Sequence, residues 1–405
     1  MATTTRTTCT PPHKASVTAA ASIVPAKNKV ITMNIPNADT SASPKPSKCE
    51  IQLTERQHRL CAGQLADDDD VAVFVSADQV VFQVETTQSL LVTRTIRQIG
   101  TVSEDFTFNL PKPVFDAFKK DLTEGLPIIH ESGQVTIKKR ALSFPLVGKA
   151  RLKSYTEPVA EPHLTASCGS KALGKALDFC IPFANVVGAN KTGRIYFDGP
   201  DIYSVIPKVG AGVAEVTAIN FPRMCVTTTA AKKLRRALAH MEPTVQISLF
   251  KDQVSFSDSA TTLTIPTTHF GTQSPAAILM AAQRAQGVFV SPRDVRKIQL
   301  LHGILKRPRR KDVVSLTLTY ASGDLVAKLE GFNRMAPGIL SEASLVVSQG
   351  TQSWNVLAAL DGFLNADFDD QGGPITIAGI PDQALCMSQT SEDVRLNAFV
   401  SLLRP

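Results

Sequence analysis

The feature of this sequence that most constrains its fold is a long-period repeat of strands and helices. Three times, a short apolar strand runs into a helix whose apolar residues recur at intervals of three and four: residues 106–111 into 112–122, residues 224–228 into 229–240, and residues 345–349 into 350–360. One and the same spacing separates Phe115 from Leu234 and Gln134 from Gln253, which belong to different elements of the pattern. A spacing shared by two elements predicts tandem copies of one folding unit.

A hairpin of alternating strands follows each of these helices, and a further strand, helix and pair of turn-linked strands precedes it. Val245, Ile247 and Leu249 illustrate the alternation, which gives a strand one apolar face. We therefore predict an α+β fold of three tandem domains, each with two helices packed on one side of antiparallel sheets. The third copy is longer, with extra residues around 367–373. The predicted domains span residues 49–157, 158–275 and 276–405.

Residues 1–48 have a different composition from the rest of the chain. They are rich in Thr, Ser, Ala and Pro, and they carry six Lys/Arg against Asp39 as the single acid. Because the whole chain has a net charge of +7, the remainder is close to neutral. We interpret this segment as a flexible basic tail, with an organelle transit peptide as the alternative. No apolar stretch is long enough to span a membrane, so we expect no transmembrane helix. The scattered cysteines, odd in number, favour a reducing, cytoplasmic interior.

Several kinds of chemistry are not indicated by the sequence. The cysteines number seven, an odd count, and no two form a CxxC pair, which argues against a disulfide framework or a zinc ribbon. No phosphate-binding loop, HExxH or GxSxG motif occurs. Residues 67–70 are four consecutive aspartates, which more commonly form a solvated loop than a metal site. We therefore predict neither an enzyme nor a metal or other cofactor.

Lysine and arginine are concentrated on the free faces of the predicted helices. Phosphate contacts require little beyond such charges, and no motif that reads bases is present, so we predict sequence-independent contact with double-stranded DNA. Ordinary solvated helix faces are the alternative interpretation. In the third copy, a basic loop at 306–311 follows the earlier helix, whereas the later helix at 350–360 carries no basic residue. The candidate DNA-binding residues are Arg56, Arg59, Lys119, Lys120, Lys171, Lys175, Lys232, Lys233, Arg235, Arg236, Arg293, Arg296 and Lys297.

Taken together, these features resemble the bacterial DNA polymerase III β sliding clamp over about residues 50–405. The resemblance depends on the threefold recurrence, on the segment 108–122 and on the apolar end of the chain. It implies a crescent that pairs head to tail with a second copy, a homodimeric ring around DNA with helices lining the hole. It also implies a DNA polymerase and a clamp loader as partners. The basic tail and the near-neutral body are departures that favour a divergent member, of viral or plasmid origin.

The same resemblance implies a groove for short hydrophobic peptides of these partners. The family has an Asp-Gly turn in its second domain, matched here by Asp198-Gly199, although the His-Arg that usually follows is replaced by Pro200-Asp201. The family's apolar terminus is matched by residues 399–405, without its usual Met and Pro positions. Core packing is the alternative role for these positions. Carried over residue by residue, the groove comprises Phe197, Gly199, Ile202, Phe270, Phe399, Ser401 and Leu403.

The function that this sequence favours is therefore a processivity factor, which encircles duplex DNA and tethers a replicative polymerase. The main alternative is a protein of the same fold that acts as a docking or structural module without encircling DNA. An enzyme on a repeated α+β scaffold and a phage capsid or tail protein are further alternatives. An enzyme predicts a cluster of perturbed polar groups in one cleft, and the sequence shows no such cluster. A capsid or tail protein would not explain basic faces on paired helices.

Overall fold

The computed structural model describes most of the chain after the predicted tail. The described residues are 46–96, 99–139, 142–146, 161–184, 193–270, 276–284, 287–304, 313–321, 323–333, 336–345, 353–380 and 383–402. Pro44–Pro405 forms one compact unit. Most of the tail, the basic loop at 306–311 and the segments around the predicted boundaries at 157 and 275 lie outside the described residues, so the domain limits stay predictions.

Three successive sets of elements repeat one order of strands and helices. The first set is β1 (Ser47–Ile51), α1 (Glu55–Gln64), β2 (Asp70–Val75), β3 (Gln79–Thr86), β4 (Ser89–Ile96), β5 (Ile99–Thr101), β6 (Phe106–Pro111), α2 (Lys112–Ala117), α3 (Lys119–Glu124), β7 (Leu126–Glu131), β8 (Gln134–Lys139) and β9 (Leu142–Leu146). The second set is β10 (Leu164–Gly169), α4 (Ser170–Cys180), the 3-10 helix η1 (Ile181–Ala184), β11 (Arg194–Gly199), β12 (Asp201–Ile206), β13 (Gly210–Val216), β14 (Phe221–Thr227), α5 (Thr228–Leu238), β15 (Thr244–Leu249), β16 (Gln253–Ser257) and β17 (Thr261–Pro266).

The third set begins with a helix that has no counterpart among the described residues of the other two sets. It comprises α6 (Ala276–Arg284), β18 (Val288–Val290), α7 (Pro292–Ile304), β19 (Val313–Ala321), β20 (Asp324–Asn333), β21 (Ala336–Leu345), β22 (Trp354–Ala359), α8 (Leu360–Leu364), β23 (Ile375–Ile380), β24 (Ala384–Thr390) and β25 (Val394–Ser401). The fold is thus α+β with two main helical positions and antiparallel strands in each set, as the sequence predicts.

Local sequence explains where the principal helices begin. Thr54 caps α1 by accepting a hydrogen bond from the Gln57 backbone N–H, while the Gln57 side chain accepts one from the Thr54 backbone. Thr227 caps α5 in the same way, through the Ala230 N–H at 3.1 Å. From these starting points α5 buries Leu234 and the other apolar side chains of one stripe against the sheets. Its charged side chains are left on the opposite face.

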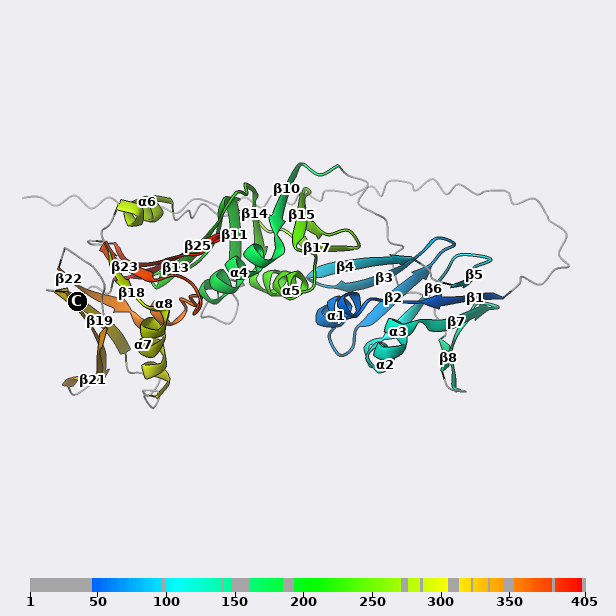
Figure 1. Cartoon of the computed structure of the whole chain (residues 1–405), viewed down its shortest axis with the longest axis horizontal. Helices are drawn as coiled ribbons and strands as arrows, with labels where there is room; N and C mark the ends of the chain where they lie inside the picture. The colour runs from blue at the N-terminus through cyan, green and yellow to red at the C-terminus, as the bar shows by residue number, and fades with distance from the viewer. Residues whose placement is uncertain are drawn as a thin grey trace, which may run out of the picture. The chain divides into compact units, whose positions relative to one another are not determined.

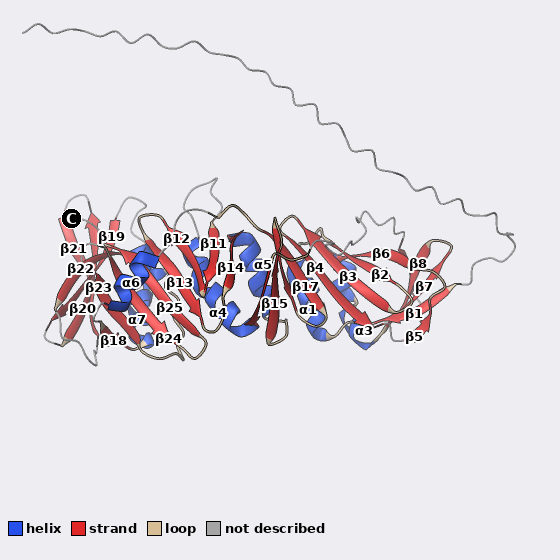
Figure 2. Cartoon of the chain, turned by 90° about the horizontal axis from the view of Figure 1, so that it is seen from above, coloured by secondary structure: helices blue, strands red, loops and turns tan. Residues whose placement is uncertain are grey.

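Adjacent sets are joined by antiparallel pairing of edge strands. One eight-stranded sheet, here sheet B, has the order β10-β15-β16-β17-β4-β3-β2-β6, so that β17 of the second set pairs with β4 of the first. A second eight-stranded sheet, sheet C, has the order β14-β11-β12-β13-β25-β24-β23-β18, so that β25 of the third set pairs with β13 of the second. Figure 2 shows these strands running side by side across both junctions. Two further sheets, β5-β1-β7-β8-β9 and β21-β20-β19-β22, end in β9 and β21.

Helices and sheets form two layers with one main apolar core between them. In Figure 1, α1, α4, α5 and α7 lie on the same side of the sheets, and α5 packs beside both α1 and α4. The main core fills the space between these layers and includes fully buried Phe82, Phe115 and Phe256. The opposite, outer face of sheet C carries a second apolar cluster that includes Tyr203, Val213 and Phe399, and α6 packs on it.

The predicted helix at residues 350–360 is wrong. Residues 354–359 form strand β22, which pairs antiparallel with β19 from Tyr320↔Trp354 to Ser315↔Ala359, and the helix α8 begins only at Leu360. Leu345, which the sequence places at the start of the preceding strand, ends β21 instead. The apolar spacing of this short segment is compatible with either a helix or a strand. The backbone hydrogen bonds with β19 favour the strand.

The described cysteines act as small apolar residues. Cys49, Cys61, Cys168, Cys180, Cys225 and Cys386 are all buried and free of disulfides. Burial raises the pKa of the Cys61 thiol to about 12. Among the described helices, none has the length and apolar character needed to cross a bilayer.

A substitution at Gly212 tests how closely strand β13 of sheet C approaches the helical layer. A Cβ at this position would lie 2.4 Å from Cδ2 of the fully buried Phe183. We expect Gly212→Ala to lower the free energy of unfolding by about 1–3 kcal/mol, because the extra methyl overfills the core. The matched control is Gly63→Ala in α1, where a Cβ meets nothing within 4 Å and should stabilise the helix slightly. Chemical denaturation measures the free energy of unfolding of both variants. Equal effects of the two substitutions would contradict the close approach of Gly212 to Phe183.

Candidate nucleic-acid interface and peptide-binding face

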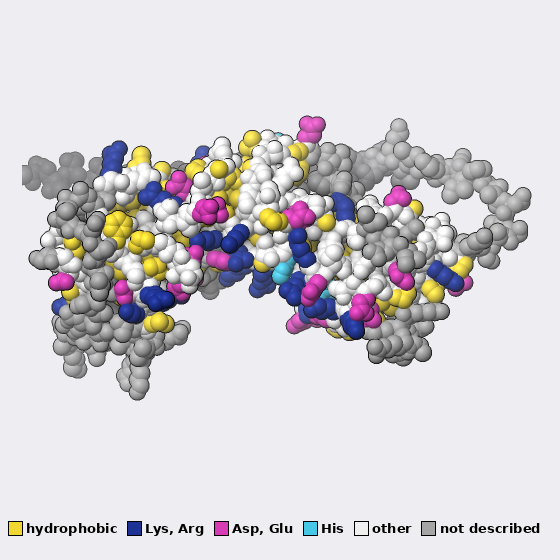
Figure 3. Space-filling view, viewed as in Figure 1, with side chains coloured by type: hydrophobic (Ala, Val, Ile, Leu, Met, Phe, Trp, Pro, Cys, Tyr) yellow, Lys and Arg dark blue, Asp and Glu magenta, His cyan; other side chains and the backbone are white. Residues whose placement is uncertain are grey.

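The helical side of the molecule carries the predicted DNA-binding residues. They project from α1, α3, α4, α5 and α7 and are exposed or half-buried. Figure 3 shows lysine and arginine side chains gathered over the region of α5 and α1, with acidic side chains among them. The partners of these side chains divide them into four groups with different capacities to bind phosphate.

Four of the predicted residues are available to a polyanion. Lys171 of α4, Lys232 and Arg236 of α5, and Arg293 of α7 are exposed and make no ion pair or hydrogen bond within the described part of the chain. Among the described residues, no carboxylate lies within 4.0 Å of the charged atoms of these four side chains, although Lys171 also lines the acidic cleft beside α4.

Four further residues make exposed pairs within their own helices or with a neighbouring helix. Arg59 lies 2.7 Å from Glu55, and Lys119 approaches the same carboxylate at 3.8 Å. The hydrogen bond from Arg59 is the main reason why the pKa of Glu55 is lowered. Lys120 pairs with Glu124 at 3.7 Å, and Lys297 pairs with Asp294 at 2.8 Å. Because exposed pairs of this kind are weak, they leave these cations exchangeable with phosphate.

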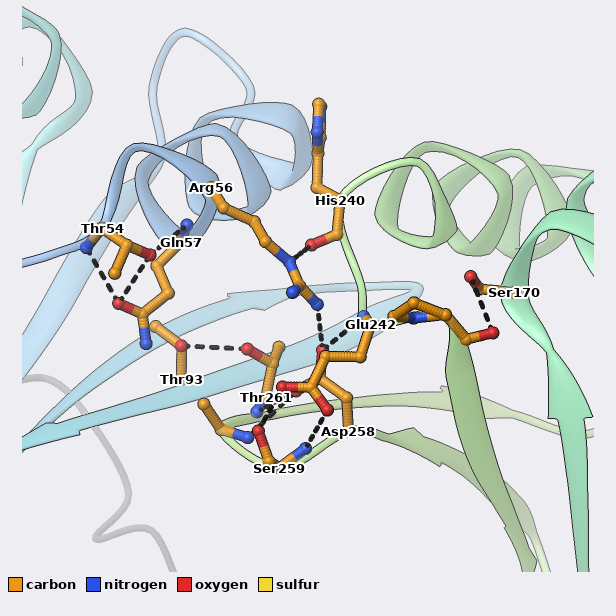
Figure 4. A network of polar contacts seen from close by, with 12 residues as sticks. Thr54, Arg56, Gln57, Thr93, Ser170, His240, Glu242, Asp258, Ser259 and Thr261 are labelled. Atoms are coloured by element: carbon orange, nitrogen blue, oxygen red, sulfur yellow. Dashed lines mark hydrogen bonds and ion pairs between the residues drawn. The ribbon is translucent and has the colours of Figure 1, made fainter.

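Arg56 and Lys233 instead connect the first and second sets of elements. Nη2 of Arg56 lies 2.7 Å from the Asp258 carboxylate, and its Nε donates to the His240 carbonyl (Figure 4). The other oxygen of Asp258 accepts the backbone N–H groups of Ala260 and Thr261. Nζ of Lys233 donates to Thr86 at 2.6 Å, and burial lowers the pKa of this lysine. Both side chains thus have a structural role at this junction.

A cleft of about 570 Å³ lies between α4, α5, α7 and the extra segment of the third set. Lys175 contacts Asp369 at 2.7 Å, and Arg296 contacts Asp370 at 2.9 Å. The hydrogen bond from Lys175 is the main cause of the lowered pKa of Asp369. Four cations and six carboxylates line the cleft: Lys171, Lys175, Arg235, Arg296, Asp178, Asp367, Asp369, Asp370, Glu392 and Asp393. Arg235 pairs with Asp178 at 2.6 Å.

The residues predicted to form the peptide groove lie on both faces of sheet C. Phe197 and Ile202 are fully buried in the main core on the helical side. Phe270 and Phe399 belong to the second cluster on the outer face, where Phe270 packs edge-on against Tyr196 at 5.4 Å. Gly199 adopts φ 62 in the β11–β12 turn, Ser401 is half-buried at the end of β25, and Leu403 lies outside the described residues. The structure therefore brings together Phe270 and Phe399.

Sequence reasoning missed the helix that covers this outer face. Leu279, Ala281 and Ala282 of α6 pack against the second cluster. The run of helix-forming Ala, Ile, Leu and Met at residues 276–282 is a signal that could have revealed it. The contact with sheet C, by contrast, has no local sequence signal.

Comparisons with known proteins show similarity of structure without detectable similarity of sequence. No model of a known protein family matches the chain, and no curated protein matches it. Solved structures do match over 89% of this chain and the full length of each structure. They include a putative DNA polymerase III β subunit from Eubacterium rectale (TM-score 0.66, 10% identity), the DNA polymerase sliding clamp of Pseudomonas aeruginosa (0.66, 15%) and that of Bacillus subtilis (0.68, 11%). The chain thus has the fold of a sliding clamp, with three tandem α+β units.

The Arg56–Asp258 pair should be important for stability, because the Asp258 side chain is only 2% exposed. We expect Asp258→Ala to lower the free energy of unfolding by about 2–4 kcal/mol, since it leaves buried donors without an acceptor. Glu55→Gln, which removes an exposed partner of Arg59, should give no measurable change. Urea denaturation followed by circular dichroism measures both. A neutral Asp258→Ala would show that the pair does not join the two sets.

Proposed function

We propose that this chain is a DNA sliding clamp, a non-enzymatic processivity factor that encloses duplex DNA and slides along it. One observation carries the proposal: three copies of one unit are joined edge to edge, and the helices on one side present unpaired cations. The fold shared with bacterial sliding clamps supports it. Exposed lysine and arginine contacts with phosphate are independent of sequence and exchange readily, as sliding requires.

We propose that two copies of the chain close the ring through β9 and β21. Each junction within the chain pairs the last strand of the first half of one set (β4 or β13) with the last strand of the second half of the next (β17 or β25). By the same rule, β9 and β21 are the strands left over, and each lies at the end of its sheet. Pairing β9 of one copy with β21 of another, twice, gives a closed homodimer without free edges at these positions.

The proposed partners are double-stranded DNA, a replicative DNA polymerase and a clamp loader. Tethering a polymerase to an enclosing ring raises its local concentration at the primer end, which is the physical basis of processivity. The proposed location is the cytoplasm, at a nucleoid or a viral replication site. The basic tail at residues 1–48 would add affinity for nucleic acid or direct import into an organelle.

A second candidate function is a docking module of the same fold that does not enclose DNA. The observation that favours it is the cleft beside α4, where the carboxylates outnumber the cations. Native mass spectrometry separates the candidates, because a ring requires a dimer and a docking module does not.

A topological assay tests the clamp directly. The full chain, with a clamp loader and ATP, is incubated with nicked circular DNA and passed over a sizing column, and the isolated complex is then cut with a restriction enzyme. A ring should stay with the circle and leave the DNA after linearisation. Retention that does not change after cutting would favour ordinary binding over enclosure.

The four unpaired cations should dominate the attraction to DNA. We expect the variant with Lys171, Lys232, Arg236 and Arg293 changed to Ala to bind duplex more weakly. The slope of log K against log salt should fall by about 0.9 for each phosphate that the protein no longer neutralises. The control changes Lys251 in the β15–β16 turn to Ala and should leave the slope unchanged. Fluorescence anisotropy with a labelled duplex of about 30 base pairs measures both; an unchanged slope in the fourfold variant would place the DNA elsewhere.

The acidic loop of the third set should compete with DNA for Lys175 and Arg296. We expect Asp369→Asn combined with Asp370→Asn to raise the affinity for duplex severalfold at low salt, since both cations then become available to phosphate. The matched control is Asp121→Asn, in α3 and away from the cleft. Weaker binding by the double variant would show that the loop orders the cations instead of masking them.

A further inference from the structure

We propose that a row of carboxyl groups across sheet C makes the junction between the second and third sets sensitive to acidity, with Asp201 as the group that takes up and releases the proton. The row runs through directly opposed residues of three neighbouring strands, Asp198 of β11, Asp201 of β12 and Glu215 of β13. Arg395 of β25 continues it on the other side of the junction. The proposal concerns the free protein, so it goes beyond the enclosure of DNA and does not depend on it.

The register of the strands places the three carboxyl groups of this row side by side. In an antiparallel sheet, the side chains of directly opposed residues lie on the same face and within reach of one another. Ile202 and Ala214, the chain neighbours of Asp201 and Glu215, belong to the main core, so the row lies on the outer face of sheet C. All three acidic side chains are half-buried. Like charges in directly opposed positions destabilise a sheet.

Asp201 occupies the middle of the row without a counter-charge of its own. Within the described part of the chain, its carboxylate makes neither an ion pair nor a hydrogen bond. Burial raises the pKa of Asp201 from 3.8 to about 6, with further contributions from the negative charges of Glu215 and Asp198. This carboxyl group therefore changes its charge in mildly acidic solution.

The cations beside the row leave this charge uncompensated. Arg223 of β14 lies 3.8 Å from Asp198, at the exposed end of the row. Among the described residues, Arg395 makes no ion pair with Glu215, and its buried Nε has no hydrogen-bond partner. The other elements around the row contribute the titratable or charged groups Cys180 (α4), Tyr196 (β11), Tyr203 (β12), Arg284 (α6) and Asp393 (the β24–β25 turn).

Two backbone hydrogen bonds connect the row to the third set. The Val216 N–H donates to the Pro200 carbonyl, and the Thr217 N–H donates to the Asp393 carbonyl, each at 2.9 Å. Because Pro200 directly precedes Asp201, repulsion between the opposed carboxylates of β12 and β13 acts on the first bond. The second bond follows one residue later, so the same strain reaches the contact with the third set. When Asp201 is protonated, this repulsion disappears and its O–H can donate to the opposed carboxylate.

The corresponding row at the junction between the first and second sets is uncharged. Counted from the second residue of the joining strand β17, it consists of Thr262, Val92 of β4, Gln83 of β3 and Ala72 of β2. Strand by strand, these residues take the places of the four charged residues in sheet C. The fold therefore does not require charges at these positions, and the carboxyl row is specific to the junction between the second and third sets.

The link between proton binding and stability has a definite sign at this site. Because folding raises the pKa of Asp201, the folded chain binds more protons than the unfolded chain between pH 3.8 and about 6. Stability therefore falls as the pH rises through this window, and the contribution of the neutral carboxyl is lost above it.

Urea denaturation of the full chain at about pH 5 and about pH 7.5 tests the proposal, with Asp201→Asn as the variant that keeps the shape of the neutral carboxyl. Between these pH values, we expect the unfolding equilibrium constant of the unmodified protein to rise about fivefold more than that of the variant, after allowance for solvent screening of a half-buried group. Histidines titrate in the same range, so the difference between the two proteins is the measured quantity.

Two further variants separate the row from the rest of the surface. Glu215→Gln should give a pH dependence between those of the unmodified protein and Asp201→Asn, because it removes one charge while the burial of Asp201 remains. Asp78→Asn, which changes an exposed acid of the β2–β3 turn, should behave as the unmodified protein.

Hydrogen exchange followed by mass spectrometry at the same two pH values locates the effect. After correction for intrinsic exchange rates, peptides that cover residues 210–218 should be more protected at the lower pH in the unmodified protein, and equally protected at both in Asp201→Asn. The proposal is overturned if Asp201→Asn keeps the full pH dependence of stability, or if the protection of residues 210–218 does not respond to pH in the unmodified protein. Neither measurement involves DNA, so the topological assay decides the proposed function separately.

Discussion

The interaction on which the rest of the structure depends is the pairing of edge strands between successive sets of elements. A single set has sheets that end in open backbone, and such edges are stable only when they are covered or paired. At β4–β17 and β13–β25 the edge strands of neighbouring sets pair with each other, so that each eight-stranded sheet contains strands of two sets. This arrangement places α5 in contact with both α1 and α4, since each helix packs on strands that cannot move separately. Side chains reinforce one junction further, as Arg56 reaches the buried carboxylate of Asp258.

The electrostatics of the helical side follow from the same construction. The cations on a surface that attracts a polyanion also repel one another. In this near-neutral body, many of the cations are paired with nearby carboxylates, which reduces that repulsion. The pairs at Arg59, Lys297 and Lys175 cost little to exchange for phosphate, because they are exposed or half-exposed. Cations held in this way favour weak contacts that form and break rapidly. Such contacts suit the proposed sliding clamp, because tight binding would only slow the movement of a ring along DNA.

Much of this architecture could be predicted from the sequence, because it follows from local patterns that occur three times. Alternating apolar residues revealed the strands, and the common spacing of Phe115–Leu234 and Gln134–Gln253 revealed the repeat. Three kinds of feature could not be predicted. Residues 354–359 became a strand because β19 offers a distant edge. Phe197 and Phe399 fell on opposite faces of sheet C because register and a bulge in β11 decide the direction of each side chain. Acidic partners such as Asp258 lie too far away in sequence to be recognised.

The two faces of sheet C are under different physical constraints. Its helical face must fill a core against α4 and α8, where any change in volume is costly, so its residues are fixed by packing. Its outer face does not have to fill a core in this way. On the corresponding face of sheet B, hydroxyl side chains that bond to one another are sufficient for a stable sheet. An apolar cluster, a covering helix and unpaired donors on the outer face of sheet C are therefore not required by the fold. Buried donors without acceptors, such as Nδ2 of Asn397, lower the stability of the protein, so packing elsewhere in the fold has to offset their cost.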